Sequence, residues 1–75
     1  MKFNDTAFKH HYTVADILSC INYAYDVKIL DEDPMKWNYL GFSVSGVPIE
    51  VISIMSRSGE EMVIHAMRQP AGQRR

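Results

Sequence analysis

The chain has 75 residues, of which 47% are hydrophobic, and its formal net charge is −1. This composition fits one small globular domain, and it excludes a disordered chain and a protein drawn to nucleic acid by its overall charge. A single cysteine, Cys20, excludes an internal disulfide framework and favours a reducing compartment. Because the sequence has no long apolar stretch and no apolar signal region, we expect a cytoplasmic protein without membrane contact.

Two helices are predicted in the first third of the chain. Asn4 and Asp5 are candidate N-caps for a short helix that runs to about His10 or His11, within residues 1–12. Thr13, with Asp16 three residues later, resembles a capping box at the start of a longer helix. Beyond it apolar side chains recur at helical spacing, which predicts a main helix within residues 13–25 whose core-facing stripe is Val14, Ile17, Leu18, Ile21 and Tyr25.

Residues 27–67 show strand patterns separated by short turns. The turns are DEDP around Pro34, the Ser45–Gly46 pair and SRSG around Gly59. Because short loops make neighbouring strands antiparallel, this region predicts four strands in a meander. The predicted fold class is therefore α+β, a single domain with one short and one longer N-terminal helix packed on a four-stranded antiparallel β-meander, followed by a flexible tail over residues 68–75.

His65, in the last predicted strand, is the first candidate for chemistry. If Ile64 and Ala66 face the helix, strand alternation turns Val63, His65 and Met67 to the opposite face. An imidazole on that face can act as general base or general acid, because its pKa lies near neutral pH. The alternative is a half-exposed histidine that only packs against a neighbouring strand.

Lys9, His10 and His11 lie just before the main helix. Lysine and histidine can hold a phosphate, and imidazole can move protons. Adjacent residues of a helix point about 100° apart, so the two histidines do not share one target if this turn is helical. Ordinary packing and solvated surface are the alternative. The three histidines and Cys20 lack the paired spacing of a zinc site, so neither a metal nor another cofactor is predicted.

Short motifs between residues 8 and 70 together resemble a known family. They are Lys9–His10 at the opening of the main helix, an acid-rich turn, LG in a strand, SGVPIEV across a hairpin and VIHAM at the end of a strand. This set is similar to the small BrnT-like toxins of bacterial type II toxin–antitoxin modules, within the RelE/ParE-type toxin group. The resemblance spans nearly the whole chain.

The resemblance implies a ribonuclease toxin that arrests translation and is neutralised by an antitoxin encoded beside it, in this family a ribbon-helix-helix DNA-binding protein. The substrate would be RNA, free or ribosome-bound. The simplest cleavage uses no metal: a base takes the 2′-OH proton and an acid protonates the leaving 5′-oxygen. For these two roles we assign His65, with His10 or His11 as its counterpart. Lys9, Arg57 and Arg68 are assigned to phosphate contacts, and Trp37 and Tyr39 to base stacking. The alternatives are simple solvent exposure for Arg57 and strand packing for the two aromatic residues.

Two positions depart from the family pattern. Met67 stands where the last strand of the family carries arginine, with Arg68 one place later, and Lys36 near Trp37 replaces a glutamate–arginine pair. These changes and the near-zero net charge also fit a second class, a non-catalytic module of the same fold that binds an antitoxin or another protein. A structural α+β domain is the third class. A homodimer and a toxin–antitoxin hetero-oligomer are the assemblies considered.

Overall fold

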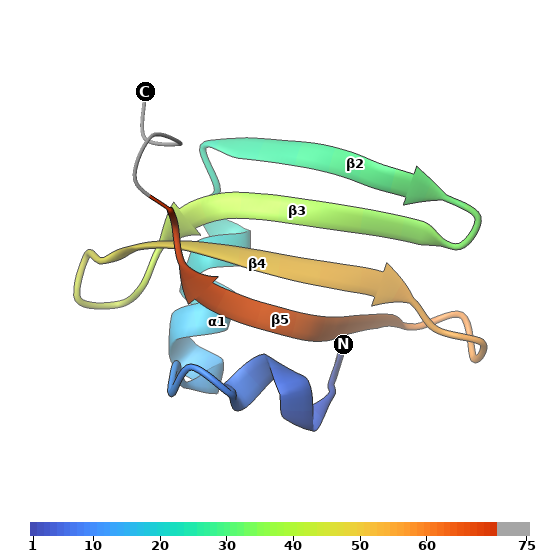
Figure 1. The fold of residues 1–75 in the computed structure, drawn as a ribbon, viewed down its shortest axis with the longest axis horizontal. Coiled ribbons are helices and arrows are strands. Elements are labelled where there is room, and N and C mark those ends of the chain that lie inside the picture. Colours follow the sequence, from blue (N-terminus) through green and yellow to red (C-terminus); the bar gives the residue numbers. More distant parts are fainter. Residues whose placement is uncertain (71–75) are drawn as a thin grey trace.

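The sheet of this protein has five strands, which span Lys2–Phe3 (β1), Asp26–Glu32 (β2), Met35–Phe42 (β3), Pro48–Met55 (β4) and Glu61–Arg68 (β5). Their order across the sheet is β1-β5-β4-β3-β2 (Figure 1). Strands β2 to β5 pair antiparallel with their sequence neighbours, whereas β1 runs parallel to β5. The computed structural model describes residues 1–70.

The prediction of a four-stranded antiparallel meander under two helices is wrong. The sheet has a fifth strand and is mixed, because Lys2 and Phe3 pair in parallel with Met62 and Val63 of β5. The Asn4 N–H continues this contact by donating to the Val63 carbonyl at 2.9 Å. A strand of two residues is too short to show alternation, so the sequence pattern carries no signal for it.

The predicted short helix is a single 3-10 turn, η1 (Asp5–Phe8), and not an α-helix. Asn4 caps this turn, since its side-chain oxygen accepts from the Thr6 N–H at 3.1 Å. The Thr6 hydroxyl in turn donates to the Ile64 carbonyl at 2.6 Å. These bonds hold one turn against β5, and Figure 1 shows this segment lying along the β5 side of the sheet.

One α-helix, α1 (Val14–Asn22), packs on the sheet behind β3 and β4 in Figure 1. The predicted capping box is confirmed: the Thr13 hydroxyl accepts from the Asp16 N–H, and the Asp16 carboxylate accepts from the Thr13 N–H, both at 3.1 Å. The helix ends before residue 25 because the Tyr25 N–H donates to the Leu40 carbonyl at 2.9 Å and already joins the sheet. Within residues 1–70, no helix has the length and apolar character needed to cross a membrane.

The core lies where α1 and η1 meet one face of the sheet. Gly41 of β3 allows the close approach of α1, since a Cβ at this position would lie 2.7 Å from the Cys20 carbonyl oxygen. Burying an aliphatic side chain contributes about 1.5–3 kcal/mol, so a small set of buried residues holds the layers together. That set is Ala7, Ile17, Cys20, Ile49, Val51, Val63 and Ala66.

The face of the sheet opposite α1 is called the open face below. Directly paired residues of an antiparallel sheet share a face, and successive rows alternate between faces. The row of Val51 and Ala66 belongs to the core, so the next row, Ile52 and His65, lies on the open face. The prediction that His65 faces away from the helix is confirmed.

A β-bulge in β5 breaks this alternation immediately before His65. His65 pairs with Ile52, whereas Val63 pairs with the adjacent Ser53, so Ile64 is an extra residue in β5. Val63 therefore returns to the core, where it is fully buried. The expectation that Val63 shares a face with His65 is wrong for this reason.

The prediction of a flexible tail over residues 68–75 is wrong for Arg68 and Gln69. Strand β5 includes Arg68, and Gln69 is buried. The Gln69 amide donates to the carbonyl oxygens of Gly41, at 3.4 Å, and Ile49, at 3.1 Å, which anchors this end of the chain across β4 and β3. The remainder of the predicted tail, residues 71–75, lies outside the described residues.

Candidate acid–base site on the open face

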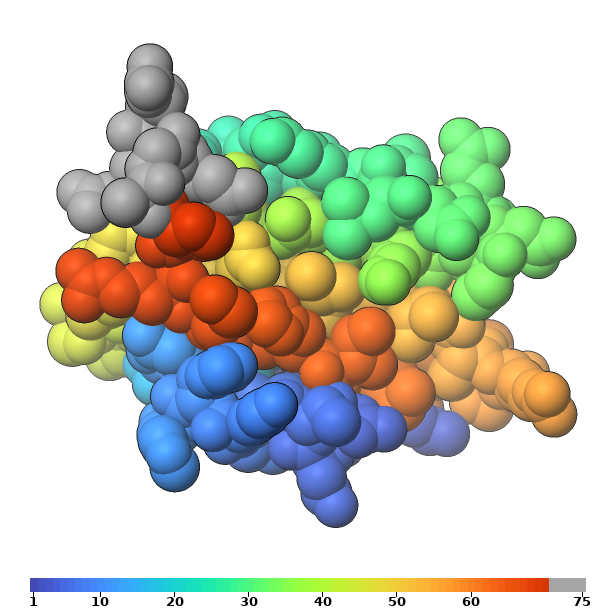
Figure 2. Space-filling view, in the orientation of Figure 1, coloured from blue at the N-terminus to red at the C-terminus, as the bar shows by residue number. Residues whose placement is uncertain are grey.

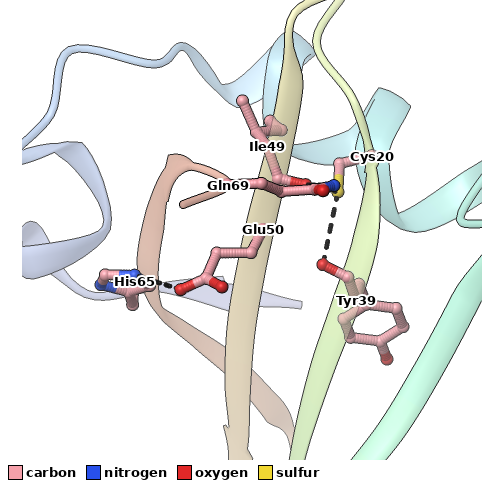
Figure 3. Close-up of polar contacts among 6 residues, drawn as sticks. All are labelled: Cys20, Tyr39, Ile49, Glu50, His65 and Gln69. Carbon is pink, nitrogen blue, oxygen red and sulfur yellow. Dashed lines mark hydrogen bonds and ion pairs between the residues drawn. The ribbon is translucent and has the colours of Figure 1, made fainter. Parts of the chain in front are cut away.

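A histidine and a carboxylate form a pair on the open face. His65 of β5 lies opposite Ile52, and Glu50 lies two residues earlier on β4, on the same face. The His65 Nε2 atom is 3.1 Å from Glu50 Oε2. Figure 3 shows the two side chains pointing toward one another across the two strands. Strand spacing of about 4.8 Å brings such diagonal neighbours within reach of long side chains.

Glu50 determines which nitrogen of His65 is available for chemistry. Glu50 is 9% exposed, and an ionised carboxylate only accepts hydrogen bonds. With Glu50 ionised, Nε2 donates this hydrogen bond, which leaves Nδ1 as the nitrogen that can accept a proton. The side chain of His65 keeps 28% of its surface exposed, so a substrate can reach it. A buried carboxylate that holds one imidazole nitrogen is the arrangement that orients a catalytic histidine.

His10 brings a second imidazole to this pair. The ring centroids of His10 and His65 are 5.9 Å apart, and the ring planes meet at 77°. The contact joins the turn after η1 to β5, so the two ends of the described chain meet here. His10 is exposed. Two neighbouring imidazoles can divide proton transfer, one accepting and one donating.

Lys9 and His11 flank His10 and are both exposed. His11 has a φ of 70°, in the left-handed region, so the backbone turns sharply after His10. These residues follow η1 as a turn and do not continue it as a helix. Of the two adjacent histidines, His10 is the one whose ring packs against His65.

The two predicted phosphate-binding arginines lie at opposite ends of β5. Arg57 is in the turn between β4 and β5, and Arg68 is the last residue of β5. Arg68 pairs with Ile49, so its Cβ lies on the α1 side of the sheet. Its backbone is about 10 Å along the strand from His65. Of the three predicted phosphate-binding cations, Lys9 is therefore the one next to His10 in the chain, and the two arginines lie toward the two ends of β5.

The two predicted stacking residues, Trp37 and Tyr39, lie on the α1 side of the sheet. Trp37 pairs with Ser53, which is fully buried beneath that face. The Tyr39 hydroxyl donates to Glu61 at 2.7 Å, and the Ser53 hydroxyl donates to the same carboxylate. Burial, together with the Glu61 carboxylate, raises the pKa of Tyr39 to about 12. The sheet thus separates both aromatic side chains from His65.

Cys20 is a buried packing residue. Its side chain is fully buried, and Sγ donates to the carbonyls of Tyr39, at 3.7 Å, and Ile49, at 3.6 Å (Figure 3). Burial raises the pKa of the Cys20 thiol to about 12. The thiol is therefore neutral near pH 7 and a poor nucleophile.

Glu50 and Asn38 lie on the open face near His65, and the sequence interpretation assigned neither of them to the site. A carboxylate inside a nearly continuous apolar strand is a signal for a buried acid that needs a partner, and Glu50 fits this description. Asn38 lies in the same cross-strand row as His65 and is 9% exposed. Its Oδ1 atom has no hydrogen-bond partner within residues 1–70, an arrangement that costs about 1–3 kcal/mol.

The described part of the chain, residues 1–70, brings no three His, Cys, Asp or Glu side chains together as a metal-ligand set. No protein-family model matches the chain, and neither a curated protein nor a solved structure matches it. The likeness to BrnT-like toxins therefore rests on the sequence motifs, and the chemistry of the site rests on its geometry.

Proposed function

We propose that this protein is a metal-independent endoribonuclease, acting in the bacterial cytoplasm as the toxin of a type II toxin–antitoxin module. The observation that carries the proposal is the 3.1 Å contact between His65 Nε2 and Glu50 Oε2, with the His10 ring packed against His65. This arrangement supplies an oriented base, whose side chain is 28% exposed, and a second proton carrier beside it. The BrnT-like motifs supply the direction toward RNA.

The cleavage needs only groups of this chain and the RNA itself. His65 Nδ1 takes the proton from a ribose 2′-OH, and the 2′-oxygen forms a bond to the adjacent phosphorus. The bond from phosphorus to the 5′-oxygen breaks, and protonated His10 gives its proton to that oxygen. The products are a 2′,3′-cyclic phosphate and a 5′-OH end. Exchange with water returns the proton from His65 and restores it to His10.

Glu50 acts as a positioning residue and not as a catalytic one. Its carboxylate holds the Nε2–H of His65, so the ring keeps Nδ1 directed away from Glu50. The same carboxylate stabilises the imidazolium that forms when Nδ1 accepts a proton. Lys9, next to His10 in the chain, is the cation available to the phosphate during the transition state.

The proposed protein partner is an antitoxin encoded beside this gene, of the ribbon-helix-helix type found with BrnT-like toxins. A partner that covers the His65–Glu50 pair would block RNA access and so neutralise the toxin. Free or ribosome-bound RNA is the proposed substrate.

A non-catalytic protein-binding module is the second candidate, because of where the arginines lie. Arg57 and Arg68 lie at opposite ends of β5, so they do not form one phosphate clamp around His65. In this alternative the same open face binds an antitoxin or another protein, and His65 serves only the contact.

Inducible expression in bacteria distinguishes these candidates. We expect the wild type to slow growth and degrade RNA, and His65→Ala to do neither, because loss of a general base lowers the rate by about 10²–10⁴-fold. His11→Asn is the matched control, since asparagine tolerates the left-handed conformation at this position and His10 stays in place. A wild type that leaves growth and RNA unaffected would contradict the toxin proposal, and an equally toxic His65→Ala would contradict the site alone.

A further inference from the structure

We propose that the outer edge of β2 pairs with β2 of a second copy of this chain, antiparallel and with Val27 on the two-fold axis. Strand β2 is the last strand on its side of the sheet, and all seven of its residues are exposed. In Figures 1 and 2 β2 forms one long margin of the molecule, while the N-terminal segment covers the opposite margin beside β5. The proposal is independent of ribonuclease activity.

The exposed edge carries unusual apolar surface for a strand in contact with water. Val27 is 50% exposed, Ile29 58% and Leu30 47%. The backbone N–H and C=O groups on the outer side of an edge strand are open to pairing with another strand. A second copy of β2 would satisfy these groups and cover the apolar side chains together.

Charge selects one register for this pairing. In a two-fold antiparallel pair, opposed residues share a face, so the register moves in steps of two residues along each strand. With Val27 opposite Val27, Asp26 of each copy lies opposite Lys28 of the other, which forms two pairs of opposite charge. The neighbouring registers place Lys28 opposite Lys28, or Asp26 opposite Asp26. Like charges directly opposed are destabilising, so the central register is favoured.

The same register places matching side chains on both faces of the joined sheet. Val27 pairs with Tyr39 within its own chain and lies on the α1 side. Asp26 and Lys28 pair with Leu40 and Asn38 and lie on the open face. The two-fold pairing thus joins apolar residues on the α1 side and complementary charges on the open face.

A bulge limits the pairing to the first half of β2. The register with β3 shifts between Ile29 and Asp31, so Leu30 is an extra residue in β2. Bulges and charged residues are the features that protect edge strands from open-ended association. Here the bulge at Leu30 and the charges of Asp31 and Glu32 protect the second half of the strand. The first half remains for a closed two-fold dimer, and the pairing does not propagate into a fibre.

The contact is short, so the dimer should be reversible. Stable specific interfaces bury about 1,200–2,000 Å² in total, and a single strand pair of a few residues falls below this range. We therefore expect a dimer whose population rises with protein concentration, from a monomer of 8.6 kDa.

Sedimentation equilibrium of purified charge variants over a wide concentration range tests the proposal. Lys28→Asp leaves acids at both positions 26 and 28, and Asp26→Lys leaves lysines at both. The dimer affinity of each variant alone should therefore be at least about tenfold lower than that of the wild type. An equal mixture of the two variants should dimerise, because every cross-strand pair is then opposite in charge. Arg57→Asp, in the β4–β5 turn, is the matched control and should associate like the wild type. Circular dichroism confirms that each variant is folded.

A wild type that stays monomeric at all concentrations would overturn the proposal. Single variants that dimerise as tightly as the wild type would also overturn it, because the contact would then lie elsewhere. A mixture that remains monomeric while the wild type dimerises would overturn the register.

Discussion

Gly41→Ala tests the contact that seats α1 on the sheet. The new methyl carbon would lie 2.7 Å from the Cys20 carbonyl oxygen and 3.1 Å from both Cα and Sγ of Cys20. Favourable carbon contacts lie at about 3.5–4.0 Å, and two of the three opposing atoms belong to the helix backbone, so α1 itself must shift. Overpacking of this kind costs about 1–3 kcal/mol. For a domain of this size, each kcal/mol lowers the melting temperature by about 4–8 °C.

Thermal unfolding followed by circular dichroism measures this effect. Cys20→Ala, alone and combined with Gly41→Ala, is the control, because it removes only the Sγ contact. We expect the double variant to keep most of the Gly41→Ala destabilisation, since the closest contact is with the backbone oxygen. A melting temperature for Gly41→Ala within about 2 °C of the wild type, which corresponds to less than about 0.5 kcal/mol, would refute the described packing of α1 on β3.

Three further predictions concern groups that the structure buries or holds by hydrogen bonds. The pKa of the Cys20 thiol is about 12 in the folded protein against a reference of 9.0, so the unfolded chain loses this proton at lower pH than the folded protein does. The free energy of unfolding should therefore fall above about pH 9, by up to about 1.4 kcal/mol per pH unit. Urea titration at several pH values should show a smaller slope for Cys20→Ala. Hydrogen bonds from the Thr13 and Val44 N–H groups lower the pKa of Asp16. The contribution of Asp16 to the free energy of unfolding should be complete above its unfolded pKa of about 3.9 and should be lost as the pH falls through its folded pKa. Acid unfolding should therefore depend less on pH in Asp16→Asn. Asn38→Val removes a buried acceptor without a partner within residues 1–70 and should raise the melting temperature or leave it unchanged; a large fall would show that Asn38 makes a stabilising contact.

The sequence predicted the features that depend on local chemistry. Thr13 and Asp16 form the expected capping box because both partners lie within one turn of the helix. Gly46 and Gly59 have positive φ, as the hairpin and turn patterns indicate. Ile17 of the predicted core-facing stripe is fully buried, whereas the prediction is wrong for Val14 and Leu18, which are 43% and 38% exposed.

Features set by contacts distant in the sequence were not predictable in this way. Strand β1 exists only because Lys2 and Phe3 meet β5, and no periodicity marks two residues. The Ile64 bulge returns Val63 to the core, and no glycine or other turn residue in this part of the sequence indicates it. The site shows the same limit: the position of His65 followed from alternation, whereas its pairing with Glu50 depends on the register of β4 and β5.

The central claim is that His65, held by Glu50, cleaves RNA without a metal. The most direct test incubates purified protein with RNA in excess chelator and identifies the product ends. We predict 2′,3′-cyclic phosphate and 5′-OH ends from the wild type and from His11→Asn, and about 10²–10⁴-fold slower cleavage by His65→Ala. Absence of cleavage by the folded wild type, or equal cleavage by His65→Ala, would contradict the account.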